Sequence, residues 1–147
     1  MTPSEITDRL QSELPLTRAM GMSVVSWDGA VVTLVAPLQP NLNHADTAFG
    51  GSISCMGILA GYALVYLLFQ ERGISTRVVI QKSTTDYLRP IDTEITSTAS
   101  LPNPAAIEEF LEMLKQKRRA RLTLNSQVLS GKTLAATHTG IYVALLY

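Results

Sequence analysis

The segment from Thr47 to Gln70 carries no charged side chain, and it limits what this chain can fold into more than any other feature. Its length would allow a helix to cross a bilayer. Its start is polar, however, at Gly50-Gly51-Ser52 and Ser54, and the rest of the chain reads as alternating strands that need a core to pack against. We therefore predict a soluble helix buried on nearly every side, and no membrane span.

The residues before this helix predict a short docking helix and then a β-hairpin. Ser4 can cap the docking helix, which Pro15 interrupts. Its apolar residues recur at helical spacing: Ile6, Leu10 and Leu14. Residues 22–37 are rich in Val and Thr, and Asp28-Gly29 near their centre suits a tight hairpin turn. Residues 39–47 then form a loop that leads into the long helix.

After the long helix, the pattern predicts a second hairpin. Gly73 can adopt the left-handed conformation that ends a helix. Residues 76–88 and 91–101 read as strands, and Arg89-Pro90 lies between them. We expect these two strands to pair with each other around this turn.

The last third of the chain predicts one surface helix and a third hairpin. Asn103-Pro104 can open a helix over residues 104–118. From residue 120 to Val143, apolar and polar residues alternate on both sides of a turn at Ser130-Gly131. The long helix needs cover on all sides, and only a curved sheet provides it. We therefore predict one α+β domain over residues 1–147, in which six antiparallel strands wrap a central helix.

Composition narrows the function classes. Lys and Arg total 12, as do Asp and Glu, so the formal net charge is 0 and a nucleic-acid partner is disfavoured. Charged residues make up 16% of the chain, below the roughly 25% of ordinary soluble domains, which favours an oligomer that hides some surface. The single Cys55 and the two histidines provide neither a disulfide nor a metal-ligand spacing. We expect a reduced, cytoplasmic setting and no metal.

The start of the long helix is the first candidate site. Gly50-Gly51-Ser52 would present unpaired backbone N–H groups and the positive end of the helix dipole, with no side chain in the way. Such a start can bind an oxygen anion. The alternative is a glycine-rich helix start that simply allows close packing.

Three polar residues just upstream, Asn43, His44 and Asp46, lie within a few positions of that helix start. Asp46 or His44 could take a proton from water, and Asn43 could orient water or a carbonyl group. The alternative is an ordinary polar turn in which Asn43 and Asp46 cap the loop.

Two further features have simple structural explanations. Cys55 lies inside the apolar helix, where a thiol is usually an inert core residue, and the surrounding residues do not form a Gly-x-Ser-x-Gly motif. A basic run spans the end of the surface helix and the residues just after it: Lys115, Lys117, Arg118, Arg119 and Arg121. It could hold the phosphates of coenzyme A, or it could only complement the helix dipole. His138 is interpreted as a structural residue.

The order of elements and three short motifs resemble the hotdog-fold thioesterase superfamily over nearly the whole chain. The motifs are Pro40-Asn41-Leu42-Asn43-His44, Phe49-Gly50-Gly51-Ser52 and Tyr87-Leu88-Arg89-Pro90. More narrowly, the chain is similar to the thioesterase-like domain that follows a GNAT-type acetyltransferase domain in some bacterial proteins. Nothing in the sequence resembles the phosphate-binding loop of those acetyltransferases.

The resemblance implies acyl-thioester substrates carried on coenzyme A or an acyl carrier protein. It also implies a homodimer with its sheets joined edge to edge, or a dimer of such dimers, and no cofactor beyond the coenzyme A of the substrate. Two positions depart from the pattern of relatives. Phe49 stands where many place a His, and Ile58 or Leu59 stands where several carry a carboxylate.

Our hypothesis is therefore hydrolysis of an acyl thioester by water. The carbonyl group would lie against the Gly51 N–H, with Asp46 or His44 as base and Asn43 orienting the water. The expected substrate-binding residues are Phe49, Gly50, Ser52, Ser83, Thr85, Arg118 and Arg119. Two alternatives stay open. One is a non-catalytic acyl-thioester binding module. The other is an enoyl-thioester hydratase, a branch that commonly uses Asp and His five positions apart, whereas Gly51 stands five after Asp46.

Overall fold

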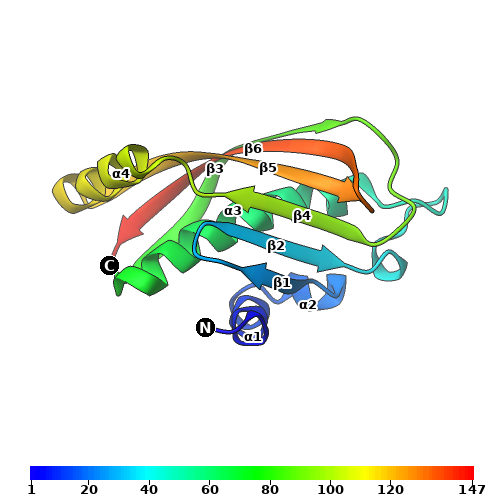
Figure 1. Ribbon diagram of the computed structural model, residues 1–147, viewed down its shortest axis with the longest axis horizontal. Helices are drawn as coiled ribbons and strands as arrows, with labels where there is room; N and C mark the ends of the chain where they lie inside the picture. Colours follow the sequence, from blue (N-terminus) through cyan, green and yellow to red (C-terminus); the bar gives the residue numbers. More distant parts are fainter.

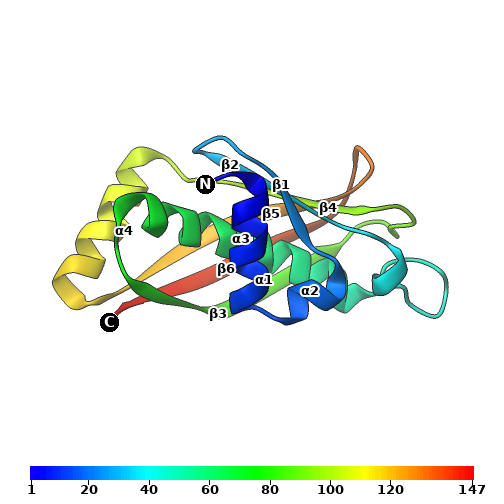
Figure 2. The same cartoon turned by 90° about the horizontal axis from the view of Figure 1, so that it is seen from below.

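A computed structural model describes residues 1–147, and one six-stranded antiparallel sheet packed on a long central helix organises it (Figures 1 and 2). The central helix is α3 (Gly50–Arg72). The strands are β1 (Ser23–Trp27), β2 (Val31–Ala36), β3 (Thr76–Tyr87), β4 (Ile95–Ser100), β5 (Arg119–Ser130) and β6 (Thr133–Leu146). Their order across the sheet is β1-β2-β4-β5-β6-β3. The predicted α+β architecture, a six-stranded antiparallel sheet around one long helix, is confirmed.

Helix α3 is the core of the molecule. By length and composition it could cross a membrane, but 72% of its most apolar window is buried inside the protein. Gly73 follows it in the left-handed conformation, at φ 64°, and ends the helix as predicted. The long apolar segment is therefore a buried core helix.

The amino-terminal helix α1 (Pro3–Glu13) is capped two residues earlier than we predicted. Thr2, not Ser4, is the cap: its hydroxyl accepts the Glu5 N–H at 3.1 Å, and the Glu5 carboxylate accepts the Thr2 N–H at 2.8 Å. This reciprocal pair needs an acidic residue three positions after the cap, which Thr2 has. A short helix α2 (Leu16–Met20) follows, and both helices cover the β1 side of α3 (Figure 2).

The predicted second hairpin is wrong. β3 pairs with β6 at one edge of the sheet, whereas β4 lies between β2 and β5. The burial of the two strands explains the separation. Ile95, Ser97 and Ala99 of β4 are buried, as suits a central strand, while most of β3 is exposed. The linker between them is anchored by the buried Ile91, whose carbonyl accepts the Ala48 N–H at 2.8 Å.

The other two hairpins and the surface helix lie where the sequence predicts them. The β1–β2 turn is closed by the Asp28 carboxylate, which accepts the N–H groups of Ala30 and Val31. These two hydrogen bonds, that to Val31 first, lower the pKa of Asp28. Helix α4 (Pro104–Lys117) is capped by Asn103. Its Phe110 ring lies 5.8 Å from that of Phe69, so α4 packs near the carboxyl end of α3.

Candidate active site

The first turn of α3 is open, as the sequence predicts. Phe49 precedes the helix, and no side chain caps its amino-terminal N–H groups. A Cβ atom at Gly51 would clash with the Phe49 ring, so glycine at this position leaves room for that ring. Gly51 is exposed. These N–H groups can therefore donate to an oxygen atom of a ligand.

The loop before α3 is closed by Asn43. Its Oδ1 atom accepts the N–H groups of Ala45 at 2.8 Å and Thr47 at 3.1 Å, and its Nδ2 atom donates to the Thr47 hydroxyl at 2.8 Å. A bridge between Leu42 and Ala48 ties the ends of the loop together. The contacts of Asn43 are thus those of a loop-capping residue, the alternative that the sequence left open.

His44 and Asp46 lie at the tip of the same loop. Both are exposed, and neither side chain forms a hydrogen bond or an ion pair within the chain. The backbone of Asp46 is left-handed, at φ 60°, a conformation that Asp and Asn tolerate better than most residues. The loop thus presents an imidazole and a carboxylate to solvent, four to seven positions before Gly50 or Gly51.

A row of polar side chains on β3 runs along the first turns of α3. The Tyr87 hydroxyl donates to the Gly50 carbonyl oxygen at 2.9 Å, and the hydroxyls of Thr85 and Ser54 lie 2.8 Å apart. Ser83 then lies 2.7 Å from the imidazole of His138 on β6. Two of the predicted residues, Ser83 and Thr85, are therefore beside the helix.

This row depends on an irregularity that the alternation of residues does not reveal. The register between β3 and β6 shifts between Ile80 and Lys82, so one extra residue sits in β3. Side chains of a regular strand alternate between faces. The bulge moves the inward face from even positions such as Ile80 to odd positions such as Ser83, a known effect of bulges near functional sites.

The family of the chain is shown by comparison with known proteins. The model of one protein family, described as "Putative thioesterase (yiiD_Cterm)", matches residues 3–146. The chain belongs to this yiiD_Cterm family. The predicted resemblance to thioesterases is confirmed at that level.

Solved structures share the fold of this yiiD_Cterm chain. A protein of unknown function from Chlorobaculum tepidum is 26% identical, with a TM-score of 0.91 over 97% of this chain and 93% of its own. A "putative thioesterase" from Shewanella oneidensis is 24% identical, with a TM-score of 0.84 over 97% and 96% of the two chains. A mutant thioesterase from Pseudomonas aeruginosa is only 8% identical, yet gives a TM-score of 0.70 over 100% and 96%. The hotdog-type fold that we predict is thus confirmed.

The basic run of the yiiD_Cterm chain lies away from the start of α3. Arg118 ends α4 in the left-handed conformation, at φ 61°, and its guanidinium group donates to the carbonyl oxygen of Tyr147. Arg119 begins β5 and is exposed. The end of α4 and the start of β5, where these residues stand, lie on the same side of the molecule as the carboxyl end of α3, opposite the 42–48 loop (Figure 2). Within one chain they are therefore not brought together with the other predicted residues.

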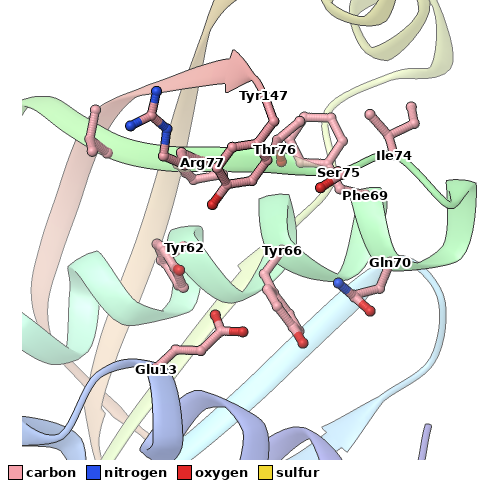
Figure 3. A pocket seen from close by; sticks show the side chains of 12 residues that line it. Glu13, Tyr62, Tyr66, Phe69, Gln70, Ile74, Ser75, Thr76, Arg77 and Tyr147 are labelled. Atoms are coloured by element: carbon pink, nitrogen blue, oxygen red, sulfur yellow. The ribbon is translucent and has the colours of Figure 1, made fainter.

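Two adjoining cavities run along α3. One, of about 570 Å³, is mainly apolar and lies between α3, β3 and the α1–α2 corner; its lining includes Leu14, Leu16, Cys55, Ile58, Tyr62 and Val79. The other, of about 640 Å³, lies further towards the end of α3. Figure 3 shows that Glu13, Tyr62 and Tyr66 form one side of it, whereas Arg77 and Tyr147 lie on the strand side. The apolar cavity begins one turn from the open helix start.

Cys55 lines the apolar cavity and is half-buried. Burial raises the pKa of its thiol, which disfavours the thiolate, the form in which cysteine acts as a nucleophile. This environment agrees with the interpretation of Cys55 as a packing residue.

Proposed function

We propose that this protein hydrolyses an acyl thioester, carried on coenzyme A or an acyl carrier protein, by direct attack of water. The observation that carries the proposal is the open start of α3, with exposed Gly51 and no side-chain cap, next to a loop that presents two candidate bases. Membership of a family described as thioesterase makes a thioester the natural substrate.

In the proposed reaction, the thioester carbonyl oxygen accepts the Gly51 N–H. Asp46 or His44 takes a proton from water as the water oxygen attacks the carbonyl carbon. The resulting oxyanion is stabilised by the N–H groups and by the helix dipole. When it collapses, the carbon–sulfur bond breaks, the thiolate leaves and takes up a proton, and a carboxylic acid is released. Asn43 acts in this scheme by holding the loop in place.

The acyl group would leave the helix start along α3. Phe49, Gly50 and Ser52 would surround the thioester, and the row that includes Thr85 and Ser83 would flank the path towards the apolar cavity. That cavity would take the apolar part of the acyl chain. In the proposed complex, Arg118 and Arg119 are available to phosphates of the carrier only if another chain brings them near. The reaction would take place in the cytoplasm, where the single Cys55 stays reduced.

A hydrolysis screen tests the function directly. Acyl-CoA substrates of increasing chain length would be supplied, and release of free thiol would be followed. We expect turnover with a clear optimum of chain length. Saturable binding of the same compounds without thiol release would instead identify a binding module, the alternative suggested by the apolar Ile58 and Leu59 at positions where several relatives carry a carboxylate.

Cys55→Ala should keep most of this activity, because water rather than a thiolate attacks the thioester. A small loss of packing at a half-buried position is the only expected cost. Thiol release and thermal unfolding measured on the same preparation check this. An inactive but well-folded variant, or an acyl group found on Cys55 by mass spectrometry, would contradict it.

We further propose that residues 1–147 act as one domain and that at least two such domains assemble through β3. This strand pairs only with β6, so its other edge has free backbone N–H and C=O groups, and Val79 on it is 52% exposed. Long exposed edges of this kind pair readily with another strand. Sedimentation should show no stable monomer, and a monomer that persists at micromolar concentration would rule out a site shared between subunits.

A further inference from the structure

The imidazole of His138 occupies a space that two glycines provide. His138 is only 1% exposed and lies between α3 and the sheet. A Cβ atom at Gly57 of α3 would lie 2.6 Å from the His138 Cβ atom, and one at Gly140 would lie 3.0 Å from its Cε1 atom. Both distances are shorter than ordinary contacts between carbon atoms. The ring is therefore held in one position by its surroundings.

The only hydrogen-bond partner of this buried ring is an exposed side chain. His138 Nε2 lies 2.7 Å from the Ser83 hydroxyl oxygen, across 55 positions of sequence. Ser83 is exposed on the edge strand, and the bulge at residue 81 turns it to the inner face. The pair thus connects a buried ring to an exposed hydroxyl on the inner face of β3, three positions after Ile80, which lines the apolar cavity.

The hydrogen bonds of His138 indicate which of its two ring nitrogens carries the proton. His138 Nδ1 is buried without a partner, and a buried N–H without a partner is costly and rare. Burial also lowers the pKa of His138, so the ring is neutral at pH 7 and carries one proton. We assign that proton to Nε2, which then donates to the Ser83 oxygen. The hydroxyl proton of Ser83 is left free to donate outward.

We propose that Ser83, positioned by His138, donates a hydrogen bond to an oxygen substituent on the acyl group, so that the protein prefers hydroxyacyl or oxoacyl thioesters to plain alkyl ones. The inference rests on the proposed function, because it takes the thioester carbonyl to lie at Gly51. His138 packs against Gly57, six residues further along α3, an axial distance of about 9 Å. The oxygen would therefore be in the distal part of a medium-length acyl group rather than next to the carbonyl.

The experiment compares octanoyl-CoA with its 3-, 5- and 7-hydroxy derivatives. A net contribution of about 0.5–1.5 kcal/mol for one hydrogen bond corresponds to about two- to tenfold in an equilibrium or specificity constant. We expect kcat/KM of the intact protein to be higher by that factor for the 5- or 7-hydroxy compound than for octanoyl-CoA. The 3-hydroxy compound should show no such preference.

Variants of Ser83 and His138 then test whether this pair causes the preference for hydroxyacyl substrates. Ser83→Ala should abolish it, and Ser83→Thr, which keeps a hydroxyl, should restore it. Thr84→Ala is the matched control, because Thr84 is exposed on the opposite face of the same strand. His138→Phe keeps a ring but removes the hydrogen bond, and it should weaken the preference through KM with kcat little changed. If His138→Phe does not fold, the Ser83 variants decide alone.

Binding measurements separate this inference from the proposed hydrolysis. Analogues in which a methylene group lies between sulfur and carbonyl resist hydrolysis, and calorimetry would give their dissociation constants. A preference that depends on Ser83, in a protein that hydrolyses none of the thioesters, would support the inference and overturn the function. Equal kcat/KM values of an active enzyme for all four acyl groups would overturn the inference and leave the function intact. A preference for the hydroxyacyl compounds that survives in Ser83→Ala would do the same. Failure of every analogue to bind would overturn both.

Discussion

Replacement of the catalytic base in the 42–48 loop should lower kcat by about 10²–10⁴-fold, the usual contribution of general-base catalysis. The two variants to compare are Asp46→Asn and His44→Gln, each of which removes a proton acceptor and nearly keeps the shape of the side chain. We expect one of them to show the full loss and the other to remain close to the unchanged protein. The effect should fall on kcat rather than KM, because the base acts in the transition state.

In this structure, Asp46→Asn and His44→Gln can be compared without a change in stability. Neither side chain has a partner within the chain, so neither substitution breaks a contact. The left-handed backbone at residue 46 accepts Asn as readily as Asp, and the loop is still closed by Asn43. Both variants should therefore unfold at nearly the temperature of the original protein. Near-normal kcat in both would falsify general-base chemistry in this loop and would favour a base from a second subunit, or a binding module.

The sequence is sufficient to predict the central helix, because the uncharged apolar segment that indicates it is continuous along the chain. A long segment without charge has to be buried, and α3 is buried as predicted. The pairing of β3 and β4 is a different problem. Both were recognised as strands, yet a turn-forming dipeptide such as Arg89-Pro90 says only that the chain changes direction there. Which strands become neighbours depends on contacts between segments far apart in sequence, and β3 pairs with β6 at the far edge.

The same distinction applies to the candidate site. Asn43, Asp46 and Gly51 are grouped by their closeness in sequence, so the sequence alone could name them. Ser83 and His138 are brought together only by the pairing of β3 with β6 and by the bulge in β3. The sequence places His138 on the final strand, and this supports only a structural interpretation. The signal that could have revealed more was the presence of Gly57 and Gly140, which leave room for a ring.

Gly61→Ala should destabilise the protein by about 1–3 kcal/mol, the usual cost of overpacking a core. Helix propensity alone would favour alanine by about 1 kcal/mol, so the expected sign is opposite to that of an ordinary helix position. The reason is the Tyr142 ring on β6. A Cβ atom at Gly61 would lie 2.5 Å from the Tyr142 Cζ atom and closer still to its hydroxyl oxygen. The ring is 1% exposed and its hydroxyl donates to the Ile58 carbonyl at 2.7 Å, so it cannot move aside without losing that bond.

Chemical denaturation of four variants would measure this effect: Gly61→Ala, Gly50→Ala, Tyr142→Leu, and the double variant that combines Gly61→Ala with Tyr142→Leu. Gly50→Ala is the control within the same helix, since a Cβ atom there meets Tyr87 only at an ordinary 3.5 Å and should cost little stability. In a Tyr142→Leu background, Gly61→Ala should cost less than in the original protein, because the clashing atoms are absent; the difference is the coupling energy of the two positions. An increase in stability for Gly61→Ala alone would show that α3 and β6 can separate locally. In that case the close packing of helix against sheet, which also holds His138 in place, would not be the rigid contact described above.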